Sequence, residues 1–332
     1  MPQPAHKFLL LIILAGATCF TACGDQSDEA QGPAAGSVKT DSFPDAPDAA
    51  MQYVLGGLAD ANGAVLWEAM PQSYRADVNA IAQLAGSKID PDIYDKVFAT
   101  ISRIATVFDK QKEFIYSSVL VDGKYDQAQV AQMRAAWPSV MNIVQALTNS
   151  SLSSAAKLQD FKGETFFANT MSTMLAQMDA LSKLQPDNEG QSLADFKKVE
   201  IEYLEGTDTE AILKMSIPGQ VAETENFIKV EGRWVPQEMA DTWASQIVET
   251  RTKLEAIDPN QMLKQKPQIL SVFVMIDGVL TQIEATETQE QFDQALQSAM
   301  MPIMGLLMMG QSMKGGMMNS APQTRPAMPV AP

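Results

Sequence analysis

One serine and one lysine stand at a spacing that can support nucleophilic catalysis. In Ser154-Ala155-Ala156-Lys157 the lysine follows the serine by three residues, and an S-x-x-K spacing lets a lysine activate a serine hydroxyl in some acyl-transfer enzymes. The S-D-N and K-T-G motifs that accompany it in those enzymes are absent from the sequence. One S-x-x-K is expected by chance in a chain of 332 residues, so we favour a structural role for both side chains.

Two acidic clusters contain carboxylates of the kind that hold calcium: Asp187, Glu189 and Asp195, and Asp90, Asp92 and Asp95. The first cluster does not meet the EF-hand pattern, because Gly190 stands at the fourth position of the loop and not at the sixth. The second cluster opens a helical stretch, where acidic side chains complement the helix dipole. We therefore interpret the first cluster as a solvated turn and the second as a helix start.

A pair of carboxylates can hydrolyse a glycosidic bond without any histidine. The chain holds 40 acidic residues, and their spacing does not single out two of them for this task. A carboxylate-based hydrolase therefore remains an alternative function without assigned residues.

The C-terminal part of the chain is rich in methionine. Thioether ligands suit Cu(I) in oxidising compartments, and Met300, Met304 and Met308 would share one face of a helix. Methionine also fills irregular apolar surfaces and adaptable interfaces, and we favour this interpretation. Copper handling by the methionine-rich C-terminus remains a second alternative.

The chain holds one histidine, His6, and two cysteines, Cys19 and Cys23. Cleavage before Cys23 would leave a mature protein without histidine and with no other thiol. Such a chain cannot build a histidine-assisted nucleophile, a Cys/His zinc site or a haem site with these ligands. We therefore expect no enzyme activity, no metal and no cofactor.

The N-terminus has the layout of a secretory signal. Lys7 precedes an apolar run, residues 8–17, that is shorter than the roughly 20 residues needed to span a bilayer. The next segment, Phe20-Thr21-Ala22-Cys23-Gly24, resembles the lipobox of bacterial lipoproteins, with Phe20 in place of the usual Leu.

The lipobox resemblance implies three processing steps. Residues 1–22 are removed as a signal peptide, the Cys23 thiol receives a diacylglycerol, and the new amine is often acylated with a chain such as palmitate. It also predicts a lipoprotein of the cell envelope, held on the outer or inner membrane and facing the periplasm or the exterior.

Residues 23–46 are rich in Asp, Gln, Gly, Ala, Ser and Pro. This composition predicts a disordered, lipid-anchored tether, with a reach of roughly 25–30 Å. The formal net charge is −16, and removal of the signal leaves 23 basic and 40 acidic residues. Nucleic-acid binding and electrostatic attraction to anionic lipid are therefore disfavoured, so the lipid must supply the membrane anchor.

Residues 47–186 repeat apolar side chains every three or four positions, which predicts a helical region. The clearest stripe runs over residues 94–108, after Asp90 as N-cap and Pro91 in the first turn. In residues 196–236 the period changes to two, which predicts a sheet of three or four antiparallel strands with a tight turn at Glu231-Gly232. The predicted fold class is α+β, mostly helical, with helices flanking the sheet.

Residues 192–309 are predicted to hold the sheet and the C-terminal helices. An apolar stripe over residues 269–283 should be well buried, and the last helix should extend to residue 309. We expect four side chains of that helix to anchor it: Phe292, Leu296, Ile303 and Leu307. Residues 310–332, composed mainly of Met, Gly, Pro, Ala and Gln, are predicted to be a disordered tail.

These patterns lead to one functional expectation. The protein should be a non-catalytic, membrane-tethered protein of the cell envelope that binds a protein partner or a small ligand. A deep pocket with converging polar groups would favour a small ligand, whereas a flat, exposed apolar patch would favour a protein.

Overall fold

A computed structural model describes residues 43–184, 192–217 and 221–298. Its helices follow one another along the chain as α2 (Pro47–Ala59), α3 (Ala64–Ala69), α4 (Gln72–Lys88), α5 (Pro91–Lys110), α6 (Lys112–Tyr116), α7 (Gln127–Asn149), α8 (Ala155–Gln159), α9 (Gly163–Thr165), the π-helical turn η1 (Phe166–Met171), α10 (Ser172–Ser182), the 3₁₀ turn η2 (Leu193–Lys198), α11 (Gln237–Glu255) and α12 (Pro259–Glu284). Between η2 and α11 lie the strands β1 (Glu200–Gly206), β2 (Glu210–Ser216), β3 (Glu223–Val230) and β4 (Arg233–Pro236). The α+β fold class is confirmed.

The four strands form an antiparallel meander in the order β1-β2-β3-β4. Glu231 and Gly232 join β3 to β4 with φ values of 50° and 76°. Two successive positive φ values define the type I′ turn that matches the twist of a hairpin. The antiparallel sheet expected near residues 196–236 is therefore confirmed.

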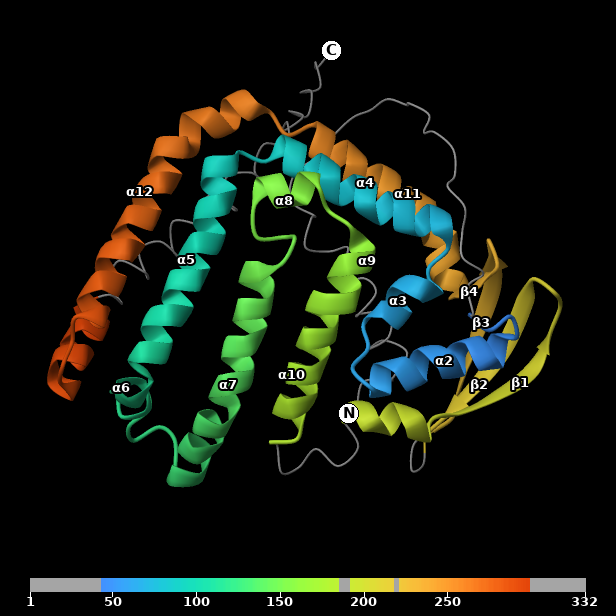
Figure 1. The fold of residues 1–332 in the computed structure, drawn as a ribbon, viewed down its shortest axis with the longest axis horizontal. Helices are drawn as coiled ribbons and strands as arrows, with labels where there is room; N and C mark the ends of the chain where they lie inside the picture. Colours follow the sequence, from blue (N-terminus) through green and yellow to red (C-terminus); the bar gives the residue numbers. More distant parts are fainter. Residues whose placement is uncertain (1–42, 185–191, 218–220, 299–332) are drawn as a thin grey trace, which may run out of the picture.

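Helix α2 packs on one side of the sheet (Figure 1). The cluster between them joins residues of α2 to inward-facing residues of the strands: Ala50, Met51, Leu55, Ala211, Leu213, Phe227 and Trp234. Trp234 donates its indole N–H to the carbonyl oxygen of Asp45 at 2.7 Å, and Phe43 packs against the same cluster. Residues 43–46, which the composition assigns to the tether, thus contact the fold.

A second cluster fills the centre of the molecule between α2, α3, α4, η1, α10 and α11. Leu58 and Leu158 are fully buried there, and the Tyr74 and Trp243 rings stack with centroids 4.1 Å apart. Val235 of β4 also belongs to this cluster. The helical region and the sheet therefore share one core.

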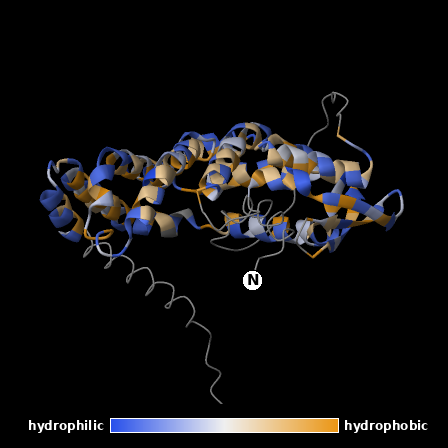
Figure 2. Ribbon diagram, turned by 90° about the horizontal axis from the view of Figure 1, so that it is seen from below, coloured by the Kyte–Doolittle hydropathy of each residue, from blue (hydrophilic) through white to orange (hydrophobic). Residues whose placement is uncertain are grey.

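On the other side of this core, four helices lie side by side in the order α12, α5, α7, α10 (Figure 1). Helices α5 and α12 run parallel, because Lys266 near the start of α12 pairs with Asp90 and Glu284 at its end pairs with Arg103. Helix α7 runs in the opposite direction to α5 (Figure 1). Figure 2 views the molecule from below and shows it as thin and elongated. We call this four-helix array the helical layer.

Helix α12 lies at the edge of the helical layer, and its burial differs from the expectation. The apolar stripe over residues 269–283 is mostly half-buried, and only Leu280 and Ile283 in it are buried, at 3% exposure each. An edge helix has a neighbour on one side only, and here that neighbour is α5. The prediction that this stripe is well buried is therefore wrong.

After α12 the chain forms a further helix over residues 289–298, which packs against the C-terminal parts of α5 and α12. Phe292 is 1% exposed and packs with Val107 of α5 and with Leu280 and Ile283 of α12. Leu296 packs against the same cluster. Two of the four anchoring residues are thus where the sequence places them, while Ile303 and Leu307 lie outside the described residues.

Candidate functional site

The serine and lysine of the S-x-x-K spacing do not meet in the fold. Ser154 is the N-cap of α8, and its hydroxyl accepts a hydrogen bond from the Lys157 backbone N–H at 3.1 Å. The Lys157 ammonium instead donates to the Ser153 hydroxyl at 2.8 Å, and that hydroxyl donates to the Ser150 carbonyl oxygen at 2.8 Å. An ammonium that donates to a serine cannot take its proton. The arrangement caps a helix and fixes a loop.

The second acidic cluster also has structural tasks. Asp90 caps α5 by accepting from the Ile93 N–H at 3.2 Å, as the sequence predicts. Lys266 of α12 bridges Asp90 and Asp92 at 2.9 and 2.5 Å. Asp95 accepts from the Ala155 N–H at 2.8 Å and so links α5 to α8.

Of the first cluster, only Asp195 lies within the described residues, while Asp187 and Glu189 lie outside them. Asp195 caps η2 through the Ser192 N–H at 3.0 Å and pairs with Lys198. Among the described residues no group of three or more His, Cys, Asp or Glu side chains is placed to hold a metal ion.

Four described carboxyl groups have a shifted pKa, and each shift is downward. The Trp137 indole and the Lys112 ammonium hold the pKa of Asp109 low, and Lys198 does so for Asp195. Lys266 lowers the pKa of Asp90. Burial raises the pKa of Asp179, but hydrogen bonds from Lys183, Leu193 and Ser192 outweigh it. The general acid of a glycosidase needs a raised pKa so that it keeps its proton. None of these four carboxyl groups is therefore suited to that role.

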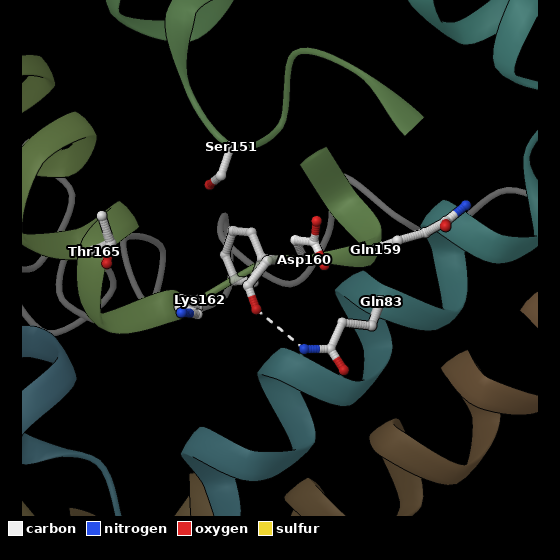
Figure 3. Close-up of a pocket in the computed structure, with 7 residues that line it drawn as sticks. Gln83, Ser151, Gln159, Asp160, Lys162 and Thr165 are labelled. Carbon is white, nitrogen blue, oxygen red and sulfur yellow. Dashed lines mark hydrogen bonds between the residues drawn. The ribbon is translucent and has the colours of Figure 1, made fainter. Parts of the chain in front are cut away.

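A pocket of about 530 Å³ lies between α4, the loop from α7 to α8, and α9 (Figure 3). Six of its seven lining residues have polar side chains, although the surface they expose to the pocket is mainly apolar: Gln83, Ser151, Gln159, Asp160, Phe161, Lys162 and Thr165. Ser151 enters from the loop after α7, opposite Asp160 and Lys162 (Figure 3). The Ser151 hydroxyl oxygen is buried and has no hydrogen-bond partner among the described residues.

Two of the polar groups in this pocket are already engaged. The Gln83 amide donates to the Phe161 carbonyl oxygen at 3.1 Å, and the Gln159 amide donates to the Gly86 carbonyl oxygen at 2.9 Å. These bonds join segments that lie more than 70 residues apart along the chain. The pocket can hydrogen-bond a small polar molecule, but its carboxamides act first to hold α4 against the α8–α9 segment.

A second feature is the apolar side of the helical layer. Each helix carries one row of half-buried or exposed apolar residues at helical spacing: Ile269, Val272, Ile276 and Val279 on α12; Val97, Ile101, Ile104 and Phe108 on α5; Met133, Val140, Ile143 and Leu147 on α7; Met174, Met178 and Leu181 on α10, after Met171 at the end of η1. In each helix the row stands about a quarter turn away from the residues that contact the neighbouring helices. We call the surface that these four rows form the apolar face.

Contacts between the helices fix the orientation of the rows. Lys96 of α5 reaches Asp277 of α12 at 2.6 Å, the Trp137 indole of α7 donates to Asp109 of α5 at 2.9 Å, and Asn142 of α7 bonds Gln177 of α10 at 3.3 Å. These contacts join neighbouring helices and therefore lie in the plane of the helical layer. With the contacts in that plane, helix geometry places all four rows on the same side of the layer. The opposite side of α7 is polar, with Gln145 and Asn149 exposed.

The apolar face is covered unevenly. Its α5–α12 end lies under the helix at residues 289–298, whose Phe292 cluster includes Ile104, Phe108, Ile276 and Val279. On α7 and α10, Val140 is 39% and Met178 is 47% exposed, and neither belongs to a hydrophobic cluster of the described chain. The exposed part of the face therefore lies over α7 and α10 and extends to Ile101 of α5, which is also 39% exposed and outside the clusters.

The helical layer is also balanced in charge. Helix α5 holds three acidic and three basic residues, α12 holds two of each, α7 holds Arg134 and α10 holds Asp179. The whole chain, by contrast, has a formal net charge of −16. The surplus of negative charge therefore lies outside these four helices.

The remaining sequence-based sites lie outside the described residues. These are the lipidation site Cys23, with the signal peptide and most of the tether, and the ligands proposed for copper, Met300, Met304 and Met308. The predicted tail at residues 310–332 lies outside them as well. Within the described part of the chain, no helix is both long and apolar enough to cross a membrane.

Comparison of the chain with protein-family models, with curated proteins and with solved structures gave no match. The function is therefore argued from the residues and geometry given above.

Proposed function

We propose that this protein is a non-catalytic lipoprotein of the cell envelope that binds a partner protein through the apolar face. The observation that carries the proposal is the rows of half-buried apolar side chains on α7 and α10, in which Val140 and Met178 are 39% and 47% exposed. Large exposed apolar patches on soluble domains mark interaction sites. The pocket described above has two of its polar side chains engaged in internal hydrogen bonds and a mainly apolar exposed lining, so it offers few free polar groups to orient a small ligand, which favours a protein.

The proposed occupant is an amphipathic helix of the partner protein. The chain itself supports this choice, because the helix at residues 289–298 already packs on the α5–α12 end of the same face through Phe292. The balanced charges of the helical layer favour a helix with an apolar, uncharged contact side. Recognition would then follow the helix-in-groove mode, in which side chains one turn apart fill the grooves between helices.

The membrane attachment rests on the segment Phe20-Thr21-Ala22-Cys23-Gly24 and the apolar run before it. The expected result of Cys23→Ser is loss of the protein from the membrane fraction, or an uncut chain that keeps its signal. Intact-mass analysis of the wild-type protein should show an N-terminal Cys23 with added acyl mass. A mature N-terminus at another residue without acyl mass would refute the anchor and leave the binding proposal to be judged alone.

The binding surface can be tested by photo-cross-linking in native membranes. p-Benzoylphenylalanine is placed at Val140 on the apolar face, and the matched control carries it at Gln145 on the polar side of α7. We expect cross-links from position 140 that map by mass spectrometry to an amphipathic helix of another protein, and none of these from position 145. Cross-links from position 140 only to lipid or to a second copy of the chain, or the same products at both positions, would refute the proposal.

A further inference from the structure

We propose that the part of the apolar face over α7 and α10 accepts amphipathic helices of differing sequence, and that its methionines supply this breadth. This inference rests on the proposed function, because it concerns the same surface. It adds the class of partner, namely helices with an uncharged apolar stripe that are recognised by the spacing of the stripe and not by particular side chains. One site would then serve several partner proteins.

Methionine is the most frequent residue in the apolar rows of α7 and α10. Met133 of α7 and Met174 of α10 are half-buried, and Met178 of α10 is 47% exposed. None of the three belongs to a hydrophobic cluster of the described chain. A methionine side chain is unbranched and polarizable, so it can change rotamer and fill a contact of a different shape. Binding surfaces that accept many partners use flexible, methionine-rich contacts that repack for each one.

The charged side chains of α7 and α10 are engaged within the protein. Helix α7 holds one of them, Arg134, which pairs with Glu113 and lies over the Tyr116 ring at 4.2 Å from its centroid. Helix α10 holds the other, Asp179, which pairs with Lys183 and accepts two hydrogen bonds from the start of η2. Partner choice by charge needs an attractive or a repulsive group at the interface. These two helices offer neither, so they favour an uncharged stripe without selecting one sequence.

The row on α7 also repeats from turn to turn. It consists of Met133, Val140, Ile143 and Leu147, which extend over about 21 Å of helix, and it contains neither an aromatic nor a polar side chain. A partner helix displaced by one turn, about 5.4 Å, therefore meets the same kind of surface. The row requires apolar side chains at helical spacing on the partner and sets no single register.

The helix at residues 289–298, at the α5–α12 end of the same face, shows what docking in one register requires. Phe292 is 1% exposed in its cluster and serves as an aromatic anchor. Gln289 donates to the Phe114 carbonyl oxygen at 3.0 Å, and Asp293 accepts from a backbone N–H between α6 and α7 at 3.2 Å. The apolar rows of α7 and α10 contain no aromatic anchor and no polar group of this kind. The two ends of the face therefore differ in selectivity.

The test uses the full lipid-anchored chain in phosphatidylcholine nanodiscs, with empty nanodiscs as the blank. Labelled helical peptides of about 15 residues, four turns of helix, share a polar side of Gln and Ser and carry a stripe of Leu, Ile, Met or Phe. A further peptide has Lys at the centre of the Leu stripe. Fluorescence anisotropy should give Kd values within about tenfold of one another for the uncharged stripes. The Lys peptide should bind more than about tenfold more weakly, because its charge would be buried without a partner.

The role of the methionines is tested by the triple variant Met133→Ile, Met174→Ile and Met178→Ile. Isoleucine keeps an apolar side chain of similar size, but its branched Cβ restricts the rotamers that it can adopt. The Kd values of the uncharged stripes should then spread beyond about tenfold, with at least one stripe still bound. The matched control, Met262→Ile with Met275→Ile, changes half-buried residues of α12 outside the apolar rows and should leave the spread unchanged. An equal spread in the triple variant and the wild type would overturn the role of the methionines.

Further outcomes separate this inference from the proposed function. If the wild type binds one stripe and the others are more than about a hundredfold weaker, the inference fails and the proposed function stands as a selective site. The same conclusion follows if no peptide binds above the blank while p-benzoylphenylalanine at Val140 still captures a partner helix in native membranes. If no peptide binds and position 140 captures no partner, the proposed function fails as well.

Discussion

The part of the molecule formed by the four strands and α2, which we call the sheet end, and the helical layer bury their apolar side chains to different extents. Under α2, Leu213 is fully buried and Phe227 is 2% exposed, because the sheet has a helix packed on its inner side. In α7, within the helical layer, the only buried residue is Ser139. Domains normally pair two layers of secondary structure around one core. The sheet end satisfies this rule, whereas no residues of the described part of the chain form a second layer over the apolar rows of α7 and α10.

The largest expected effect falls at the sheet end. Phe227→Ala should lower the free energy of unfolding by about 3–5 kcal/mol, because it leaves a cavity in a two-layered core that cannot collapse easily. Chemical denaturation followed by far-ultraviolet circular dichroism measures the loss. A change below about 1 kcal/mol would mean that the cluster under α2 is not packed as described.

Phe292→Ala should cost less, at about 2–3 kcal/mol, although Phe292 is equally buried. Its cluster holds only four buried residues and lies under an edge helix that can move inward to fill the space. Hydrogen exchange should show faster opening of α12 and of residues 289–298, with the sheet unaffected. An equal increase in the hydrogen-exchange rate of the sheet and of the helical layer would contradict the difference in packing between these two regions.

The comparison also shows which features the sequence could predict. The Asp90 cap, the stripe over residues 94–108 and the strands with their turn at Glu231-Gly232 are local patterns, and the structure contains them. The 3.6-residue period identifies the apolar side of a helix, but it does not say whether another layer covers that side. For this reason the burial of residues 269–283 was overestimated.

Two parts of the candidate site were harder to predict. Lys96, Arg103 and Lys110 of α5 are seven residues apart, as are Asp277 and Glu284 of α12, and these spacings could have revealed the row of ion pairs between the two helices. The pocket had no such signal. Its lining joins Gln83 to residues near position 160 through contacts that depend on the tertiary fold.

The ion pairs of the helical layer predict a dependence on pH. Hydrogen bonds from Lys266 lower the pKa of Asp90, and those to Asp92 and Asp90 raise the pKa of Lys266. Asp90 contributes to the free energy of unfolding at pH values above its unfolded pKa of 3.8. This contribution is lost as the pH falls through its lower folded pKa. Lys266 contributes to the free energy of unfolding at pH values below its unfolded pKa of 10.5. This contribution is lost as the pH rises through its higher folded pKa.

Lys266→Met keeps the aliphatic stem and removes the charge, so it should destabilise the protein from about pH 5 to pH 10, by less than Phe292→Ala does. Below the folded pKa of Asp90 the variant and the wild type should converge, because the wild type has then lost the same contact. Urea denaturation at a series of pH values measures the difference. A difference that persists unchanged at the acid end would mean that Lys266 acts through packing and not through charge.

The smallest effect is expected on the apolar face itself. Val140→Gln and Met178→Gln replace side chains that are 39% and 47% exposed and lie outside the described clusters. Gln has a good helix propensity, and surface substitutions away from the core usually change stability by at most about 0.5 kcal/mol. Chemical denaturation of the double variant should therefore match the wild type, whereas cross-linking from a neighbouring position such as Ile143 to the partner should weaken. A loss of stability as large as that of Phe292→Ala would show that α7 and α10 are covered by a second layer that the folded protein requires, and the difference between the two regions would disappear.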